Sequence, residues 1–269
     1  MLVAMDLGLT GKRAIVTGGS KGIGKAVARA LAMEGCDVVV ASRTFDLLDA
    51  TAKELSAETG RSITAVPVDT GVGESVARLV SEAQRILGGV DILVNSAAKP
   101  SGQSAPPKLA DVTDELFWDD MNVKVLGYLR CAQAVAPLMA AQGWGRIINI
   151  SGLGARSTGV VIGSIRNVAV AAMTKNLADE LGPSGINVTV VHPGLTRTEA
   201  TAGVVARIAA ATGVSEAEAE ATLVRNSTRH LVDASEVADI VAFLASPRSI
   251  AITGDAIACG GGQPGAIFY

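Results

Sequence analysis

The sequence predicts an α/β protein: a doubly wound parallel sheet of about seven strands flanked by helices, folded as a single domain over residues 1–269. Short runs rich in β-branched residues alternate with longer amphipathic stretches along the whole chain. Hydrophobic residues make up 49% of the 269 residues, which is enough for a large buried core, but aromatic residues make up only 3%. The core must therefore be built from Ala, Val, Ile and Leu, which suits parallel strands covered by helices on both faces.

The predicted elements follow one another in regular alternation. The strands are expected at residues 13–17, 37–41, 63–68, 91–95, 146–150, 187–191 and 255–259, which are bounded by Gly, Asp or Asn. Helical periodicity covers residues 22–34, 45–58, 73–87, 112–141, 165–181 and 234–246. Gly35 and Gly182 follow two of these helices as stop signals, and Asp233 or Ser235 can cap the last helix.

One Ala-rich, helical segment interrupts this alternation, at about residues 195–230, between the sixth strand and the last helix. In doubly wound sheets, a long insertion at the carboxyl end of a strand usually lies over the ligand crevice. We therefore expect a substrate lid there, with Glu199 and residues 216–220 on its solvated face.

Charge and composition exclude several classes of protein. The net charge is −3 and no basic cluster is present, so we expect no nucleic-acid partner. No apolar run reaches the ~18 residues that span a bilayer, and the N-terminal residues do not resemble a secretion signal. Cys36, Cys131 and Cys259 are isolated, which indicates buried thiols in a reducing compartment. With only two histidines, no metal site is expected, and we expect a cytoplasmic protein without a membrane partner.

A glycine-rich turn follows the first strand and opens the first helix. Glycines let the backbone turn tightly and approach a pyrophosphate, whose charge is stabilised by the helix N-terminus. In this strand–turn–helix context the motif predicts a dinucleotide site. The residues that we expect to form it are Gly18, Ser20, Lys21, Gly22, Ile23 and Gly24.

The end of the second strand predicts which dinucleotide is bound. An acidic residue at this point would bind a ribose 2′-hydroxyl, whereas an arginine accommodates a 2′-phosphate. Residues 38–45 contain no Asp or Glu but include Arg43, followed by Thr44. Arg43 and Lys21 together favour NADP(H) over NAD(H); the alternative is that Arg43 is a solvated surface charge.

The sequence resembles the short-chain dehydrogenase/reductase family along nearly its whole length. The matching segments are Thr17–Gly24, Asp69, Asn95–Ala98, Asn122, Ile148–Ser151, Pro193–Gly194, Thr198 and Thr253–Gly254. The resemblance implies a Rossmann-type fold, a small-molecule substrate, and a homotetramer or homodimer.

The resemblance also assigns roles to residues. It implies that Asp69 and Thr70 border the adenine and that Asn95 and Ala97 line the cofactor after the fourth strand. It places Pro193, Gly194, Leu195 and Thr198 at the carboxamide end of the nicotinamide.

The chemistry of the family requires a tyrosine that donates or removes a proton, and a lysine one helical turn later that lowers the pKa of this tyrosine. When residues 174–181 are aligned with the corresponding helix of the family, Gly163 stands at the tyrosine position and Asn167 at the lysine position. Shifting the register by one or two residues gives Ser164 or Ile165 instead of Gly163. In every register the pair is missing, because no tyrosine lies between Tyr128 and Tyr269.

No lysine lies between Lys124 and Lys175, and Lys175 is two turns beyond Asn167, too far to reach the same ribose. Of the usual catalytic residues, Asn122 remains. We predict Asn122, Ser151 and Asn167 as the catalytic group, with Ser151 polarising the carbonyl or only satisfying backbone groups, and Asn167 binding the ribose.

Other side chains are weaker candidates for the proton donor. Tyr128 is expected to pack in the core, and Tyr269 can contribute only from the chain terminus. Ser164 can cap the following helix or donate through water, and Arg166 can bind an anionic substrate or face solvent. His192 can act as a titratable group near the nicotinamide, or it can be a histidine at a strand end whose hydrogen bonds are satisfied by its neighbours.

Three functions fit these observations. We expect an NADP(H)-dependent oxidoreductase that acts on a carbonyl, an alcohol or an activated double bond with a non-standard proton donor. The alternatives are a catalytically inactive NADP(H)-binding sensor or partner subunit, and a lyase or isomerase that keeps the dinucleotide as a scaffold.

Overall fold

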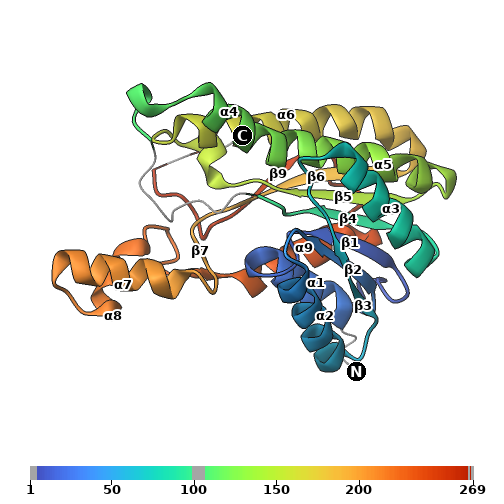
Figure 1. The fold of residues 1–269 in the computed structure, drawn as a ribbon, viewed down its shortest axis with the longest axis horizontal. Coiled ribbons are helices and arrows are strands. Elements are labelled where there is room, and N and C mark those ends of the chain that lie inside the picture. The colour runs from blue at the N-terminus through green and yellow to red at the C-terminus, as the bar shows by residue number, and fades with distance from the viewer. Residues whose placement is uncertain (1–4, 99–106, 266, 268–269) are drawn as a thin grey trace.

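The computed structural model describes residues 5–98, 107–265 and 267, and its centre is a parallel sheet of seven strands in the order β3-β2-β1-β4-β5-β6-β9 (Figure 1). Every neighbouring pair in this sheet is parallel. The strands are β1 Arg13–Thr17, β2 Asp37–Ser42, β3 Ile63–Pro67, β4 Ile92–Asn95, β5 Gly145–Ile150, β6 Ile186–Pro193 and β9 Ala256–Cys259. The predicted fold class is confirmed.

Helices cover both faces of the sheet (Figure 1). On one face, α1 Gly22–Met33, α2 Phe45–Thr59 and α9 Ala234–Ala245 pack over a core of Val, Leu, Ile and Ala side chains. On the other face, α3 Gly73–Leu87, α5 Gly127–Ala141 and α6 Val161–Leu181 pack over a second core of the same kind. The central strands are buried on both faces, as their continuous apolar sequences require.

The predicted helix 112–141 is interrupted. It consists of α4 Asp114–Met121, a π-helical turn at Asn122–Leu126, and α5. Such a turn adds one residue to a helical repeat and is frequent at functional sites. Periodicity alone could not show this, because the turn leaves the apolar pattern on either side almost unchanged.

The other boundaries differ by a few residues. Helix α6 begins at Val161 rather than residue 165, so Ser164 lies inside its first turn and does not cap it; instead the Ser164 Oγ donates to the carbonyl of Ser157 at 3.0 Å. Asp233 is the N-cap of α9, and its backbone N–H donates to the Glu236 carboxylate at 2.7 Å.

The inserted segment forms two helices that project from the sheet, at the left of Figure 1. They are α7 Thr201–Thr212 and α8 Glu216–Leu223. A second, two-stranded parallel sheet joins β7 Thr196–Arg197 to β8 Val232–Asp233 and closes the base of this projection. Only Val205 and Ala219 are buried within the two helices, so most of their surface is exposed.

Candidate functional site

A cavity of about 840 Å³ opens at the carboxyl ends of the parallel strands. Its lining comes from the segments that follow β1, β2, β3, β4, β5 and β6. It lies where the chain connections leave the centre of the sheet in opposite directions, next to β1 and β4. In open α/β sheets ligands bind at this switch point.

The turn between β1 and α1 forms the floor of the cavity and requires glycine at two positions. At Gly18, φ is +71° and an added Cβ would lie 2.8 Å from the backbone of Ser96, so the turn and the end of β4 touch directly. At Gly24, an added Cβ would lie 2.2 Å from the carbonyl oxygen of Gly18. The first turn of α1 therefore packs against the loop with no room for a side chain, and its free N–H groups face the cavity.

One of these N–H groups already holds an anion. The backbone N–H of Gly22 donates to the Glu199 carboxylate at 2.9 Å, although the two residues are far apart in the sequence. Glu199 is exposed, as expected, and its carboxylate also lies at the N-terminus of α1. A helix N-terminus stabilises negative charge, so the contact identifies this point as an anion site.

Cationic side chains lie at one end of the cavity. Lys21 and Arg43 both line it and are exposed, and neither forms an ion pair with any residue that the structure describes. Ser42 lines the same end, and its buried Oγ has no hydrogen-bond partner among the described residues. This end therefore offers two free charges and a hydroxyl to a negatively charged group.

Nearly every residue that the sequence predicts for the cofactor lines this cavity. The lining includes Gly18, Ser20, Lys21, Gly22, Ile23, Gly24, Arg43, Thr44, Asp69, Thr70, Ala97, Pro193, Gly194, Leu195 and Thr198. Asn95 does not. It is fully buried behind the wall, where its amide donates to Asn149 Oδ1 at 3.0 Å and to the Tyr128 carbonyl at 3.4 Å.

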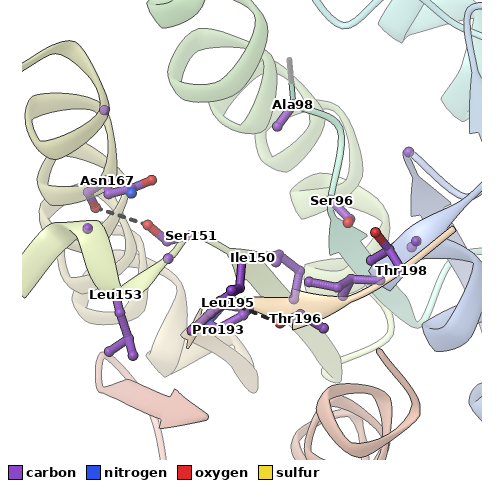
Figure 2. Close-up of a pocket in the computed structure, with 18 of the residues that line it drawn as sticks. Ser96, Ala98, Ile150, Ser151, Leu153, Asn167, Pro193, Leu195, Thr196 and Thr198 are labelled. Carbon is purple, nitrogen blue, oxygen red and sulfur yellow. Dashed lines mark hydrogen bonds between the residues drawn. The ribbon is translucent and has the colours of Figure 1, made fainter. Parts of the chain in front are cut away.

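Ser151 and Asn167 form the opposite end of the cavity. In Figure 2 they lie together, across from Ser96 and Thr198, and the Ser151 Oγ donates to the Asn167 carbonyl at 3.2 Å. Gly163, one turn before Asn167 on α6, also lines this end. A Cβ on Gly163 would come within 3.0 Å of Val160, so this part of the wall is closed by backbone and a valine side chain.

Asn122 lies outside the lining that the structure describes. Its amide donates to the carbonyl of Gly71 at 3.2 Å, and its Oδ1 accepts a hydrogen bond from Arg130 at 2.8 Å. The first contact ties the π-helical turn to the loop after β3, and the second ties it to α5. From this turn, Val123 and Lys124 line the cavity, and Lys124 is the one with a titratable side chain.

Lys124 is almost completely buried, and its Nζ faces Ser151 and Asn167. The Nζ donates to the Ser151 carbonyl at 3.0 Å and to Asn167 Oδ1 at 3.3 Å. Burial, together with the positive charge of Arg166 and against the opposing effect of Asp120, lowers the pKa of Lys124 from 10.5 to about 7. A buried amine that titrates near neutrality therefore lies in the wall of the cavity.

Arg166 is neither solvated nor free to bind an anion. It is buried on α6, and its Nη1 contacts both carboxylate oxygens of Asp120 on α4 at 2.7 and 2.8 Å. This ion pair closes the wall beside Lys124 and joins α4 to α6.

The remaining predicted donors are engaged elsewhere. Tyr128 is fully buried, and its hydroxyl donates to the Ile150 carbonyl at 2.9 Å; burial raises the pKa of this phenol. His192 Nδ1 accepts the Gly152 N–H at 3.3 Å, and burial lowers the pKa of this imidazole to about 4. Both act as packed, satisfied side chains. Tyr269 lies outside the described residues.

Lys124 is not among the site residues predicted from the sequence, although the sequence contains a signal for it. Lys124, Tyr128, Cys131 and Val135 have helical spacing and are all buried. A single lysine on an otherwise apolar helix face is expected to be buried. Burying a charged group is energetically unfavourable, so such a lysine is a candidate for a functional residue.

Comparison with known proteins gives a consistent result. A family model described as enoyl-(acyl carrier protein) reductase matches residues 18–263. The rabbit (Oryctolagus cuniculus) protein called dehydrogenase/reductase SDR family member 4 is 35% identical over 261 residues, which is 95% of each chain.

Solved structures match the whole fold. L-sorbose reductase from Gluconobacter frateurii, complexed with NADPH and L-sorbose, is 28% identical with a TM-score of 0.91, covering 98% of this chain and 100% of that chain. A short-chain dehydrogenase from Burkholderia cenocepacia in complex with NADP is 31% identical with a TM-score of 0.79, covering 94% of this chain and 98% of that chain.

Proposed function

Because this chain belongs to the short-chain dehydrogenase/reductase family, we propose that it is an NADP(H)-dependent oxidoreductase that acts on a carbonyl, an alcohol or an activated double bond. One observation carries the proposal. A single cavity joins two cations without an ion-pair partner among the described residues, an anion-binding helix N-terminus and a buried polar cluster.

The lining fits an extended dinucleotide. The glycine turn and the N-terminus of α1 would hold the pyrophosphate, in the place where Glu199 now lies. Lys21 and Arg43 would hold the 2′-phosphate, and Asp69 and Thr70 would border the adenine.

At the other end, Ala97 and Thr198 would border the nicotinamide, together with the loop that follows β6 at Pro193, Gly194 and Leu195. Asn95 would shape this wall from behind. When bound, NADP(H) supplies the hydride donor or acceptor.

The choice of cofactor is tested by Arg43→Asp. The change removes a cation from the 2′-phosphate end and introduces a carboxylate that can bind a ribose 2′-hydroxyl. In isothermal titration, the unmodified protein should bind NADPH more tightly than NADH, and the variant should reverse this order. Arg207→Asp, on the projecting helix α7, is the control for a charge change away from the cavity. Equal affinities of the unmodified protein would remove the role given to Arg43.

We further propose that the proton donor of this enzyme is not a tyrosine. The resemblance to the family places Gly163 and Asn167 where the family has its tyrosine and lysine, and no tyrosine lies between Tyr128 and Tyr269. Ser151 would polarise the substrate oxygen and Asn167 would bind the ribose. Asn122 would act as a positioning residue through the turn that it holds.

The missing tyrosine also favours a second candidate, a sensor or partner subunit that binds NADP(H) without turnover. The two functions are separated by NADPH oxidation, followed by fluorescence, with a panel of L-sorbose, simple ketones and an enoyl thioester. Consumption of NADPH with any member supports the oxidoreductase. NADPH binding without consumption across the whole panel supports the sensor.

The oligomeric state that we propose is a homodimer or homotetramer. Trp118 on α4 and Val161, Ile165 and Val168 on the neighbouring helix α6 are all exposed. Large apolar side chains gathered on adjacent helices mark a surface suited to association. Sedimentation of the purified protein measures this directly.

A further inference from the structure

A buried lysine occupies the part of the cavity where the proposed reaction needs a proton donor. Lys124 and its neighbours Ser151, Gly163 and Asn167 line one end of the cavity together. No carboxylate of the described residues lies within ion-pair distance of the Lys124 Nζ, whose two acceptors are the Ser151 carbonyl and the Asn167 amide oxygen. Burying an amine without a counter-ion is costly, so structural stability alone does not account for it.

We propose that Lys124 is the proton donor and acceptor for the substrate oxygen, taking from the π-helical turn between α4 and α5 the role that a tyrosine on α6 plays in the family. This inference rests on the proposed oxidoreductase function and names the residue that completes its chemistry.

The geometry leaves one N–H of Lys124 available. An alkylammonium has three N–H donors, and the described residues accept two of them. Both acceptors belong to the wall at the Ser151 end, so they hold the Nζ at the cavity surface. Lys124 lies in the π-helical turn at Asn122–Leu126, and turns of this kind are frequent at functional sites.

Position 163 supports the same assignment. With glycine there, the wall at this point is made by the backbone of α6 and by the Val160 side chain, which lies 3.0 Å from where a Cβ would stand. A tyrosine at this point would project into the same space from α6. Without a tyrosine there, the polar side chains that line this end of the cavity include Lys124 and Ser151.

The proton balance is simple. In the reducing direction, the carbonyl carbon gains hydride and its oxygen takes one proton from the Lys124 ammonium. The N–H bond breaks, an O–H bond forms, and the neutral amine regains a proton from solvent. In the oxidising direction, the neutral amine accepts the proton of the alcohol.

The charged groups around Lys124 favour its use as a proton donor and acceptor. Arg166 on α6 is the positive charge that acts on Lys124, and the carboxylate of Asp120 on α4 is paired with Arg166. His192 on β6, whose pKa is lowered to about 4, is neutral near pH 7. With the pKa of Lys124 lowered to about 7, both protonation states are populated at neutral pH, as acid–base catalysis requires. Carbonyl reduction should therefore slow as the pH rises through this value, and alcohol oxidation should accelerate.

The kinetic test compares Lys124→Met and Lys124→Arg with the unmodified chain on a substrate found in the panel. Methionine preserves the length of the side chain but cannot carry a proton, and arginine keeps the charge but cannot release one at neutral pH. Both variants should lose about 10²- to 10⁴-fold in kcat while binding NADPH within a few-fold of the unmodified chain. Lys53→Met, an exposed pair with Asp49 on α2, is the matched control.

A second readout does not depend on turnover. In protein labelled with ¹³C-lysine and free of cofactor, the Cε signal lost in Lys124→Met identifies Lys124. That signal should titrate near neutrality, far below the signals of exposed lysines. A midpoint above about 9.5 would overturn the inference, since an amine with its ordinary pKa is a poor neutral-pH acid.

The outcomes separate this inference from the proposed function. An active unmodified chain whose Lys124→Met variant keeps its kcat overturns the role of Lys124 and leaves the oxidoreductase intact. An active Lys124→Arg variant shows that charge alone is needed, which also overturns proton transfer. An unmodified chain that binds NADPH but reduces nothing in the panel overturns both.

Discussion

The buried amine of Lys124 should make the stability of this protein depend on pH in a window where few other groups titrate. The folded-state pKa of about 7 lies below the ordinary value of 10.5, so between these values the unfolded chain binds more protons than the folded chain. Stability should therefore rise with pH across this window. Lys124→Met removes the titrating group and should remove this part of the rise.

The magnitude follows from the difference between the two pKa values. Where the folded amine is neutral and the unfolded amine is charged, each pH unit adds about 1.4 kcal/mol. Because the folded amine is half protonated at pH 7, the gain between pH 7 and 8.5 is roughly 1.5 kcal/mol. The Met variant also loses the hydrogen bond to the Ser151 carbonyl, which changes its free energy of unfolding by an amount that does not depend on pH. This loss therefore does not affect the slope of stability against pH.

Urea unfolding of both proteins at several pH values between 7 and 8.5 measures this difference. The free energy of unfolding of the unmodified chain, minus that of the variant, should increase by the stated amount. The buried thiols have raised pKa values of about 12 and act in the opposite direction above pH 9, but they are common to both proteins and cancel. Parallel pH profiles would refute the reasoning, because they would mean that Lys124 keeps its proton in the folded state.

Two further predictions concern the glycine turn. Glu199→Gln removes the negative charge that accepts the Gly22 N–H at the N-terminus of α1. Because this charge competes with the cofactor, the variant should bind NADPH about two- to fivefold more tightly in isothermal titration. Unchanged or weaker binding would mean that the carboxylate does not compete. Gly24→Ala places a Cβ 2.2 Å from the Gly18 carbonyl oxygen, so it should lower the free energy of unfolding by about 1–3 kcal/mol and weaken NADPH binding. Gly73→Ala is the control, because its Cβ would meet no atom within 4 Å, and it should leave both quantities unchanged. Equal effects of the two substitutions would contradict the steric argument.

The main elements of the fold were predictable because their signals are local. All seven strands of the large sheet lie within a few residues of the β-branched runs that predicted them. The glycine turn was predictable for the same reason, since Gly18 and Gly24 lie within one strand–turn–helix unit. The small β7–β8 sheet was not predicted, because its strands have only two residues each and carry no period.

The site was predictable wherever a motif follows a strand. At parallel strand ends, sequence position determines which edge of the sheet a residue occupies, so residues such as Arg43 and Thr198 could be assigned to the cavity wall. Asn122 and Lys124 could not be told apart in this way. They lie two residues apart on one helix, and the π-helical turn determines which of them faces the cavity.

By itself, the sequence determined the sheet, the glycine turn and the absence of a tyrosine between residues 128 and 269, since each is a matter of residue type and short-range spacing. Tertiary structure alone decided that Lys124 is buried against Ser151 and Asn167, and that Glu199 reaches the N-terminus of α1. The reason is physical: burial, and with it the pKa of an amine, depends on packing among α4, β5 and α6, which are distant in sequence and meet only when the sheet has formed.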